Sequence, residues 1–196
     1  MDELKSSFDR AMERVEGMGK LSPEEMRERK EAEYTPAGRA ITERYLEHGH
    51  EQLFTEEVGK HGGDEGGIVR RAALVRLVEA IGLTSYETSE RALKGVIALA
   101  GENAAEDVNG IIEGMAELFK EFGENLQVKY VSEKESIEKE DRELLHQLRI
   151  SGSALGEMNM ATSEAWGEAY RELAAPFRER LEVLKQELTA AVVDNW

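Results

Sequence analysis

The sequence contains no cysteine, and this absence excludes several kinds of chemistry at once. Without cysteine there is no disulfide framework, no thiolate nucleophile, no cysteine-ligated zinc and no iron–sulfur cluster. Long hydrophobic runs are also missing, since no apolar stretch approaches the roughly 20 residues that a membrane-spanning helix needs. The first residues mix charged with apolar side chains and resemble neither a signal peptide nor a membrane anchor. We therefore expect a cytoplasmic protein with no membrane partner.

Positive charge is scarce as well. Lys+Arg 25 against Asp+Glu 41 gives a formal net charge of −16. Such a field repels nucleic-acid phosphate unless a local basic patch overrides it. The longest cationic cluster, Arg70 and Arg71 with Arg76, lies within an apolar stretch and is followed by Glu79. We therefore expect no nucleic-acid partner.

What is abundant is apolar residues at helical spacing. Hydrophobic residues make up 40% of the chain, enough for a folded core under the 34% charged surface. Stripes at offsets of three, four and seven recur, and no run alternates with period two, so the pattern predicts helices and no sheet. Representative members of these stripes are Leu74, Leu77, Val78, Ile81, Leu93, Val96, Ile97, Ala100, Val108, Ile111, Ile112 and Met115.

Local signals predict where the helices begin and end. Ser22, Pro23 and Glu25 read as a capping box with proline at the first helical position, and Pro36 reads as a second start. Gly82 is expected as a left-handed cap before a start at Thr84, Ser132 as a further start, and Pro176 as a break. The fold class is therefore all-α, a compact multi-helix bundle of about eight or nine helices, at 2–18, 23–33, 36–58, 67–82, 85–100, 104–123, 132–150, 153–174 and 176–193.

The domain organisation depends on one glycine-rich stretch. Four glycines flank Asp64 and Glu65 between Gly59 and Gly67. We interpret 59–67 as a loop that separates a charged N-terminal helical segment, 1–58, from the main helical bundle, 68–196, most simply within one domain overall.

Two Glu-x-x-His pairs are candidate metal ligands. Glu47 with His50 and Glu143 with His146 have the spacing used by helical-bundle sites for two metal ions. Glu is so frequent here that such pairs arise by chance, and Gly49 weakens the first motif. We predict no cofactor, with iron, manganese or zinc as the alternative for a di-metal oxidoreductase or metal-binding protein.

A second candidate is the stretch from Val78 to Thr88. A helix, a glycine turn and a capped helix resemble a DNA-reading helix-turn-helix in outline. The second helix begins with Glu87 and Glu90, which would face phosphate, so nucleic-acid binding is the third hypothesis.

The C-terminal region carries the leading hypothesis. A seam of apolar side chains at spacings of four, three and four is typical of a face that a partner helix fills, and a terminal tryptophan is costly to expose. Trp166 and Tyr170 with Met158 and Met160 offer a further apolar surface, which core packing would also explain. We expect a non-catalytic interaction protein (an accessory subunit, adaptor or assembly factor) that binds another protein or forms a homo-oligomer. The residues expected to do so are Phe177, Leu181, Leu184, Leu188 and Trp196.

Overall fold

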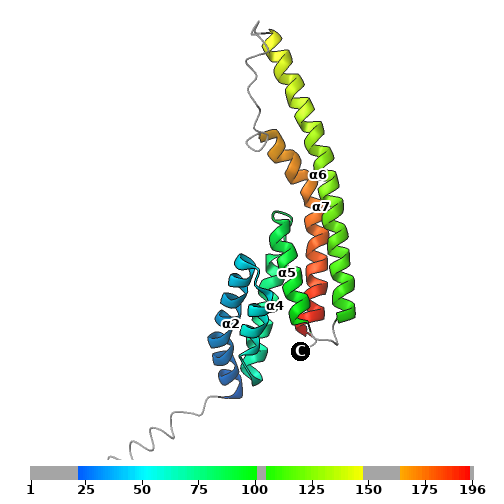
Figure 1. Cartoon of the computed structure of the whole chain (residues 1–196). Helices are drawn as coiled ribbons and strands as arrows, with labels where there is room; N and C mark the ends of the chain where they lie inside the picture. The colour runs from blue at the N-terminus through cyan, green and yellow to red at the C-terminus, as the bar shows by residue number, and fades with distance from the viewer. Residues whose placement is uncertain (1–21, 101–104, 148–163, 195–196) are drawn as a thin grey trace, which may run out of the picture.

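The computed structural model describes residues 22–100, 105–147 and 164–194 (Figure 1). Over these ranges the chain forms six α-helices and a short π-helical turn, and contains no strand, which confirms the all-helical fold class. The number of helices is smaller than the eight or nine expected. The elements are α2 (Pro23–His48), α3 (Glu51–Gly59), α4 (Gly63–Ala80), α5 (Tyr86–Leu99), α6 (Ala105–Gln147), α7 (Glu164–Thr189) and η4 (Ala190–Asp194).

Three predicted helix boundaries are wrong because the helix continues through them. Pro36 lies inside α2 and Pro176 inside α7, while Ser132 lies within the 43 residues of α6. A proline removes one backbone hydrogen bond, but both prolines are exposed and residues just beyond them are packed into the core. Gly38 follows Pro36 and is buried, and Phe177 follows Pro176 and is 5% exposed. Tertiary packing therefore outweighs the local break signal.

The capping predictions have mixed outcomes. The capping box is confirmed: the Ser22 hydroxyl accepts from the Glu25 amide at 3.1 Å, and the Glu25 carboxylate accepts from the Ser22 amide at 2.7 Å. Gly82 is not a left-handed cap, since the positive-φ glycines of the described chain are Gly49 and Gly63. Gly49, with φ of 74°, ends α2 where a continuous helix was expected. Ser85, one residue after the expected Thr84, caps α5.

The glycine-rich loop is shorter than expected. The helix α4 begins at Gly63, so only residues 60–62 lie outside helices there. The helix α2, from the charged N-terminal segment, packs along α4, from the main bundle. Backbones approach closely at Gly38, where an added Cβ would lie 2.4 Å from the Val69 carbonyl oxygen. The two segments thus share one interface.

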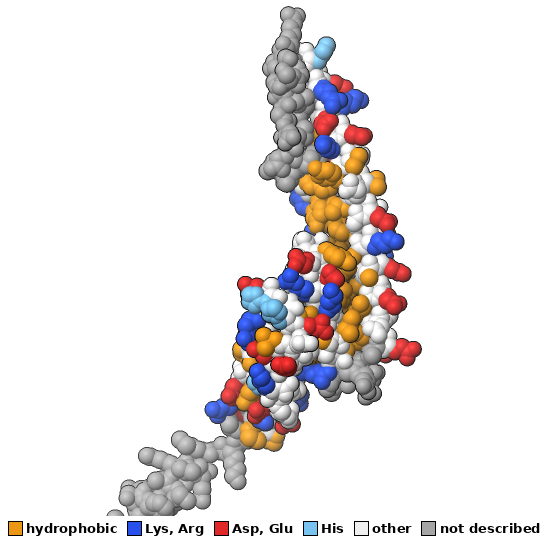
Figure 2. Space-filling view, viewed as in Figure 1, with side chains coloured by type: hydrophobic (Ala, Val, Ile, Leu, Met, Phe, Trp, Pro, Cys, Tyr) orange, Lys and Arg blue, Asp and Glu red, His pale blue; other side chains and the backbone are white. Residues whose placement is uncertain are grey.

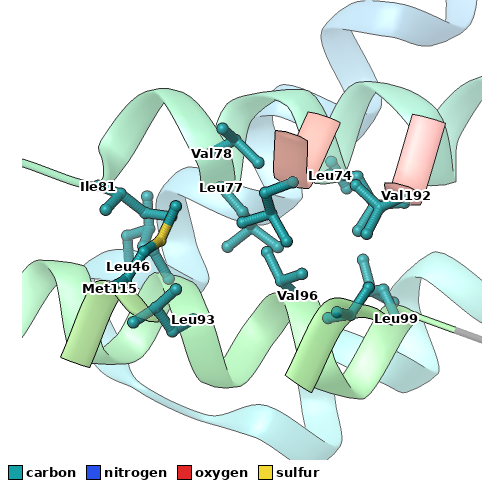
Figure 3. Close-up of a cluster of buried hydrophobic side chains, with 14 of the residues drawn as sticks. Leu46, Leu74, Leu77, Val78, Ile81, Leu93, Val96, Leu99, Met115 and Val192 are labelled. Carbon is teal, nitrogen blue, oxygen red and sulfur yellow. The ribbon is translucent and has the colours of Figure 1, made fainter. Parts of the chain in front are cut away.

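The core joins all the helices at the base of the molecule. Side chains from α2, α4, α5, α6 and η4 meet in one cluster, in which Leu77 and Met115 are fully buried (Figure 3). Val192 of η4 reaches Leu74 there, so the end of the described chain is part of the core (Figure 3). This packing fixes the N-terminal part of α6 and the C-terminal part of α7 in the core.

The helices α6 and α7 pair antiparallel and continue beyond the core as an arm (Figure 1). A helix of 43 residues is about 65 Å long, and among the described elements α6 makes most of its contacts with α7. The expected helix at 2–18, the residues Met158 and Met160 and the terminal Trp196 lie outside the described residues.

Candidate interaction surfaces

The four metal-ligand candidates lie in two distant places. Glu47 lies in the last turn of α2 and His50 directly precedes α3, whereas Glu143 and His146 lie at the far end of α6 (Figure 1). The Glu47 carboxylate oxygen lies 3.8 Å from Nε2 of His48, its neighbour in the chain. Within the described ranges, no three histidine, aspartate or glutamate side chains gather as a metal site requires. The two Glu-x-x-His pairs are therefore not brought together.

The stretch between α4 and α5 forms a helical hairpin whose cations face its own chain. Arg91 donates to the carbonyl oxygens of Leu46 and Glu47 at 2.8 and 3.0 Å, and also pairs with Glu87. It thereby satisfies acceptors left open at the C-terminus of α2. Lys94 pairs with Glu90 at 2.8 Å, and this hydrogen bond raises the pKa of Lys94. Both cations of α5, Arg91 and Lys94, are therefore engaged within the chain.

The C-terminal seam is filled from within the molecule. Phe177, Leu181 and Leu188 are 5%, 3% and 0% exposed, and Leu184 is partly buried. The helix α6 packs against this seam, and the ring centroids of Phe122 and Phe177 lie 5.2 Å apart. These side chains stabilise the fold, so a partner would meet a different surface.

The arm carries a row of aromatic rings between α6 and α7. From Phe122 the row continues to Tyr170 at 6.1 Å between ring centroids, then to Trp166 at 6.4 Å. Trp166 meets Tyr130 at 5.2 Å and an interplanar angle of 90°. Such edge-to-face contacts stabilise aromatic pairs beyond the area that they bury. The aromatic row therefore stabilises the pairing of α6 and α7 in the part of the arm that lies next to the core.

The outer end of this row is open to solvent. Tyr130 is 36% exposed, and its neighbours Val128 and Val131 are 71% and 44% exposed. Hydrophobic side chains gather over the middle of α6 and α7, with charged side chains on either side (Figure 2). By helical spacing, Val128 and Val131 lie on the outward side of α6, away from the row. We call the rings of Tyr130, Trp166 and Tyr170, together with these two outward valines, the arm surface.

Charged groups beside the arm surface are paired with each other. Lys129 meets Glu133 at 2.8 Å, and this hydrogen bond raises the pKa of Lys129. Arg180 meets Glu121 at 2.8 Å across the two helices and lies 5.5 Å from the centre of the Phe177 ring. These contacts orient the helices and surround the aromatic row with a polar rim.

Sequence reasoning found part of this surface. It singled out Trp166 and Tyr170 but not Tyr130, Val128 or Val131. The available signal was the spacing from Phe122 through Leu126 to Tyr130, which continues the buried stripe of α6 by steps of four. The expected helix start at Ser132 concealed this continuity.

The described helices include none with both the length and the apolar character to cross a membrane. No family model, no curated protein and no solved structure matches this chain.

Proposed function

We propose that this chain is a non-catalytic helical protein that binds another protein or a second copy of itself, as an accessory subunit, adaptor or assembly factor. The observation that supports this proposal is the arm surface. It presents tyrosine and tryptophan rings, half-buried, on two helices that project from a packed body (Figure 2).

The chemistry of the arm surface suits a protein partner. Tyrosine and tryptophan are enriched among the residues that contribute most to binding, because they offer large area at small conformational cost. Val128 and Val131 add exposed apolar area on the outward side of α6, and the Lys129–Glu133 pair beside them provides a polar rim. A helix or a second arm laid along α6 would cover this area.

The first prediction concerns two substitutions on this surface. In the full chain, Val128→Glu with Val131→Glu places charge on the arm surface without touching the core, so the fold is expected to stay intact. Circular dichroism and thermal unfolding check that fold. Sedimentation velocity, over a wide concentration range, is expected to show weaker self-association for the variant if the partner is a second copy. If the partner is another protein, affinity capture with the wild-type chain is expected to recover a protein that the variant loses.

A matched control is Ile97→Glu on α5, which is 48% exposed and lies on the body. It adds the same kind of charge away from the arm. We expect it to leave both the self-association and the set of captured proteins unchanged. A chain that stays monomeric and captures the same proteins with and without the arm substitutions contradicts the proposal.

A further inference from the structure

A groove of about 890 Å³ lies between α2 and α4, on the opposite part of the molecule from the arm. It runs along the N-terminal half of α2, from Pro23 to Arg39, and along α4 from Asp64 to Val75. The groove is of the size that holds a sizeable ligand or several side chains.

The side chains at the floor of the groove are apolar, and other atoms of the described chain bury them only in part. Ile68 and Val75 of α4 are partly exposed, and Met26 of α2 is 51% exposed. Leu74, beneath them, is buried and connects the floor to the core. Leaving such side chains in contact with water is unfavourable, so a covering apolar group would stabilise the groove.

The rim of the groove is basic, although the chain as a whole is acidic. Five lining residues are cationic and two are acidic, a net charge of +3 in a chain of net charge −16. Arg27 and Lys30 pair with Glu31 and Asp64, the two acidic members. Of the other three cations, Arg39 pairs with Glu79 just outside the lining. The excess charge therefore comes from Arg70, which donates to the neutral carbonyl oxygen of Leu99, and from Arg71, and it favours an occupant with acidic flanks.

The chain itself contains a segment with the matching pattern, immediately before the groove. Residues 1–21 lie outside the described ranges and lead directly to Ser22 and Pro23. Their apolar side chains recur at spacings of four, three, four and three, which places them on one face of a helix. Between residues 2 and 16 there are five acidic and three basic residues, a net charge of −2. The members of the stripe are Leu4, Phe8, Ala11, Val15 and Met18.

The length of this segment also fits. A helix over residues 2–16 is about 22 Å long, and the stretch from Pro23 to Arg39 that borders the groove is about 25 Å long. Gly17 and Gly19 lie between the two stretches, where the chain would have to reverse, and glycine adopts the conformations that reversal needs. The segment can therefore run antiparallel to α2 along the groove.

We propose that residues 2–16 form an amphipathic helix that folds back and fills the groove between α2 and α4. Phe8 and its neighbours on the stripe cover Met26, Ile68 and Val75, while Asp9 and Glu16, which flank the stripe, lie toward the basic rim. This docking site is separate from the arm surface, so its test does not depend on the proposed function.

Distance measurement between two spin labels tests the docking in the full chain. Because the chain has no cysteine, Ser6→Cys and Glu33→Cys create the only two labelling sites. Residue 6 lies opposite the apolar stripe, and Glu33 is exposed on α2. Docking predicts one narrow population at roughly 20 Å, because packed helix axes lie about 10 Å apart and each label projects beyond its helix. A broad distribution overturns the proposal.

Two further variants of the labelled chain show whether the apolar stripe is responsible. Phe8→Glu is expected to broaden the distance distribution and to lower the melting temperature by on the order of 5 °C. Arg10→Glu introduces the same carboxylate on the polar face and is expected to keep the narrow distance. Both changes lie outside the body, so its folding does not complicate them. A narrow distance that survives Phe8→Glu overturns the proposal.

A mixture of singly labelled chains tests whether the segment docks in its own molecule. Equal amounts of Ser6→Cys and Glu33→Cys chains, each carrying one label, are expected to give no short distance. The appearance of the 20 Å population in that mixture would mean exchange between two copies and would overturn docking within one chain.

Discussion

Tyr45 connects three helices through a single side chain. Its hydroxyl donates to the carbonyl oxygen of Arg91 at 2.9 Å, and its ring stacks on Phe54 with centroids 4.4 Å apart. Burial raises the pKa of Tyr45, and the nearby Glu51 carboxylate adds to the shift. The folded state thus favours the neutral phenol over the phenolate.

This shift sets the sign of a pH dependence. A group whose pKa is higher in the folded state contributes stability below its unfolded pKa, here the ordinary value of 10.0, and loses it as pH rises through the folded pKa. We expect wild-type stability to fall above about pH 10. Tyr45→Phe is expected to cost about 1 kcal/mol at neutral pH, from the lost hydrogen bond, and to make the alkaline decline shallower.

Thermal unfolding of both chains between pH 7 and 12 measures the difference. The useful control is Tyr86→Phe, because the Tyr86 side chain is 67% exposed. It is expected to follow the wild-type curve. Equal alkaline slopes for wild type and Tyr45→Phe would contradict the role given to burial of this phenol.

At the scale of the elements, the contact between α2 and α4 depends on a residue without a side chain. An added Cβ at Gly38 would lie 2.4 Å from the Val69 carbonyl oxygen and 2.8 Å from the Cβ of Ala72. Because the first of these atoms belongs to the backbone of α4, one helix must move. Gly38→Ala is therefore expected to destabilise the chain by about 1–3 kcal/mol, measured by urea unfolding.

The matched control is Gly123→Ala in α6. An added Cβ there meets no atom within 4 Å, so the change only improves the helix. It is expected to raise the free energy of unfolding by about 0.5–1 kcal/mol. If Gly38→Ala also stabilised the chain, the close approach of α2 and α4 would be refuted.

The elements show which parts of the fold the sequence could predict. The stripe of Leu74, Leu77, Val78 and Ile81 is buried as its spacing indicated, because a long amphipathic helix must bury its apolar face. The start at Ser22 was also predictable, since a capping box is a local interaction. The continuation of α2 through Pro36 and of α7 through Pro176 was not predictable, because whether a helix survives a proline depends on contacts made elsewhere in the molecule.

The candidate sites depend still more on tertiary structure. Glu47 and Glu143 satisfied the same motif, yet only the assembled helices show that they lie far apart. Ile97 matched the stripe of α5 and is nevertheless 48% exposed, so the buried face of α5 is narrower than the spacing suggested. The groove between α2 and α4 follows from the crossing at Gly38 and left no local signal in either helix.

At the scale of the whole molecule, the net charge of −16 destabilises the folded state through repulsion between carboxylates, and ion pairs offset this repulsion only in part. Many of the pairs are exposed contacts within one helix, such as Lys129 with Glu133 and Arg27 with Glu31. Exposed pairs of this kind each contribute little, because water and salt screen the attraction. The excess carboxylates repel each other over longer distances, and folding brings them closer together.

Salt should therefore stabilise this protein at neutral pH. Raising sodium chloride from 10 mM to 0.5 M shortens the Debye length from roughly 30 Å to under 5 Å, which screens repulsion between distant carboxylates. The same salt weakens the exposed pairs, but those attractions are short-ranged and individually small. We expect the melting temperature, measured by calorimetry, to rise by several degrees. Near pH 4.8, where the net charge is close to zero, the same addition of salt is expected to have little effect. A melting temperature that falls with salt at pH 7 would show that the ion pairs outweigh the repulsion, and that the acidic surface is balanced locally.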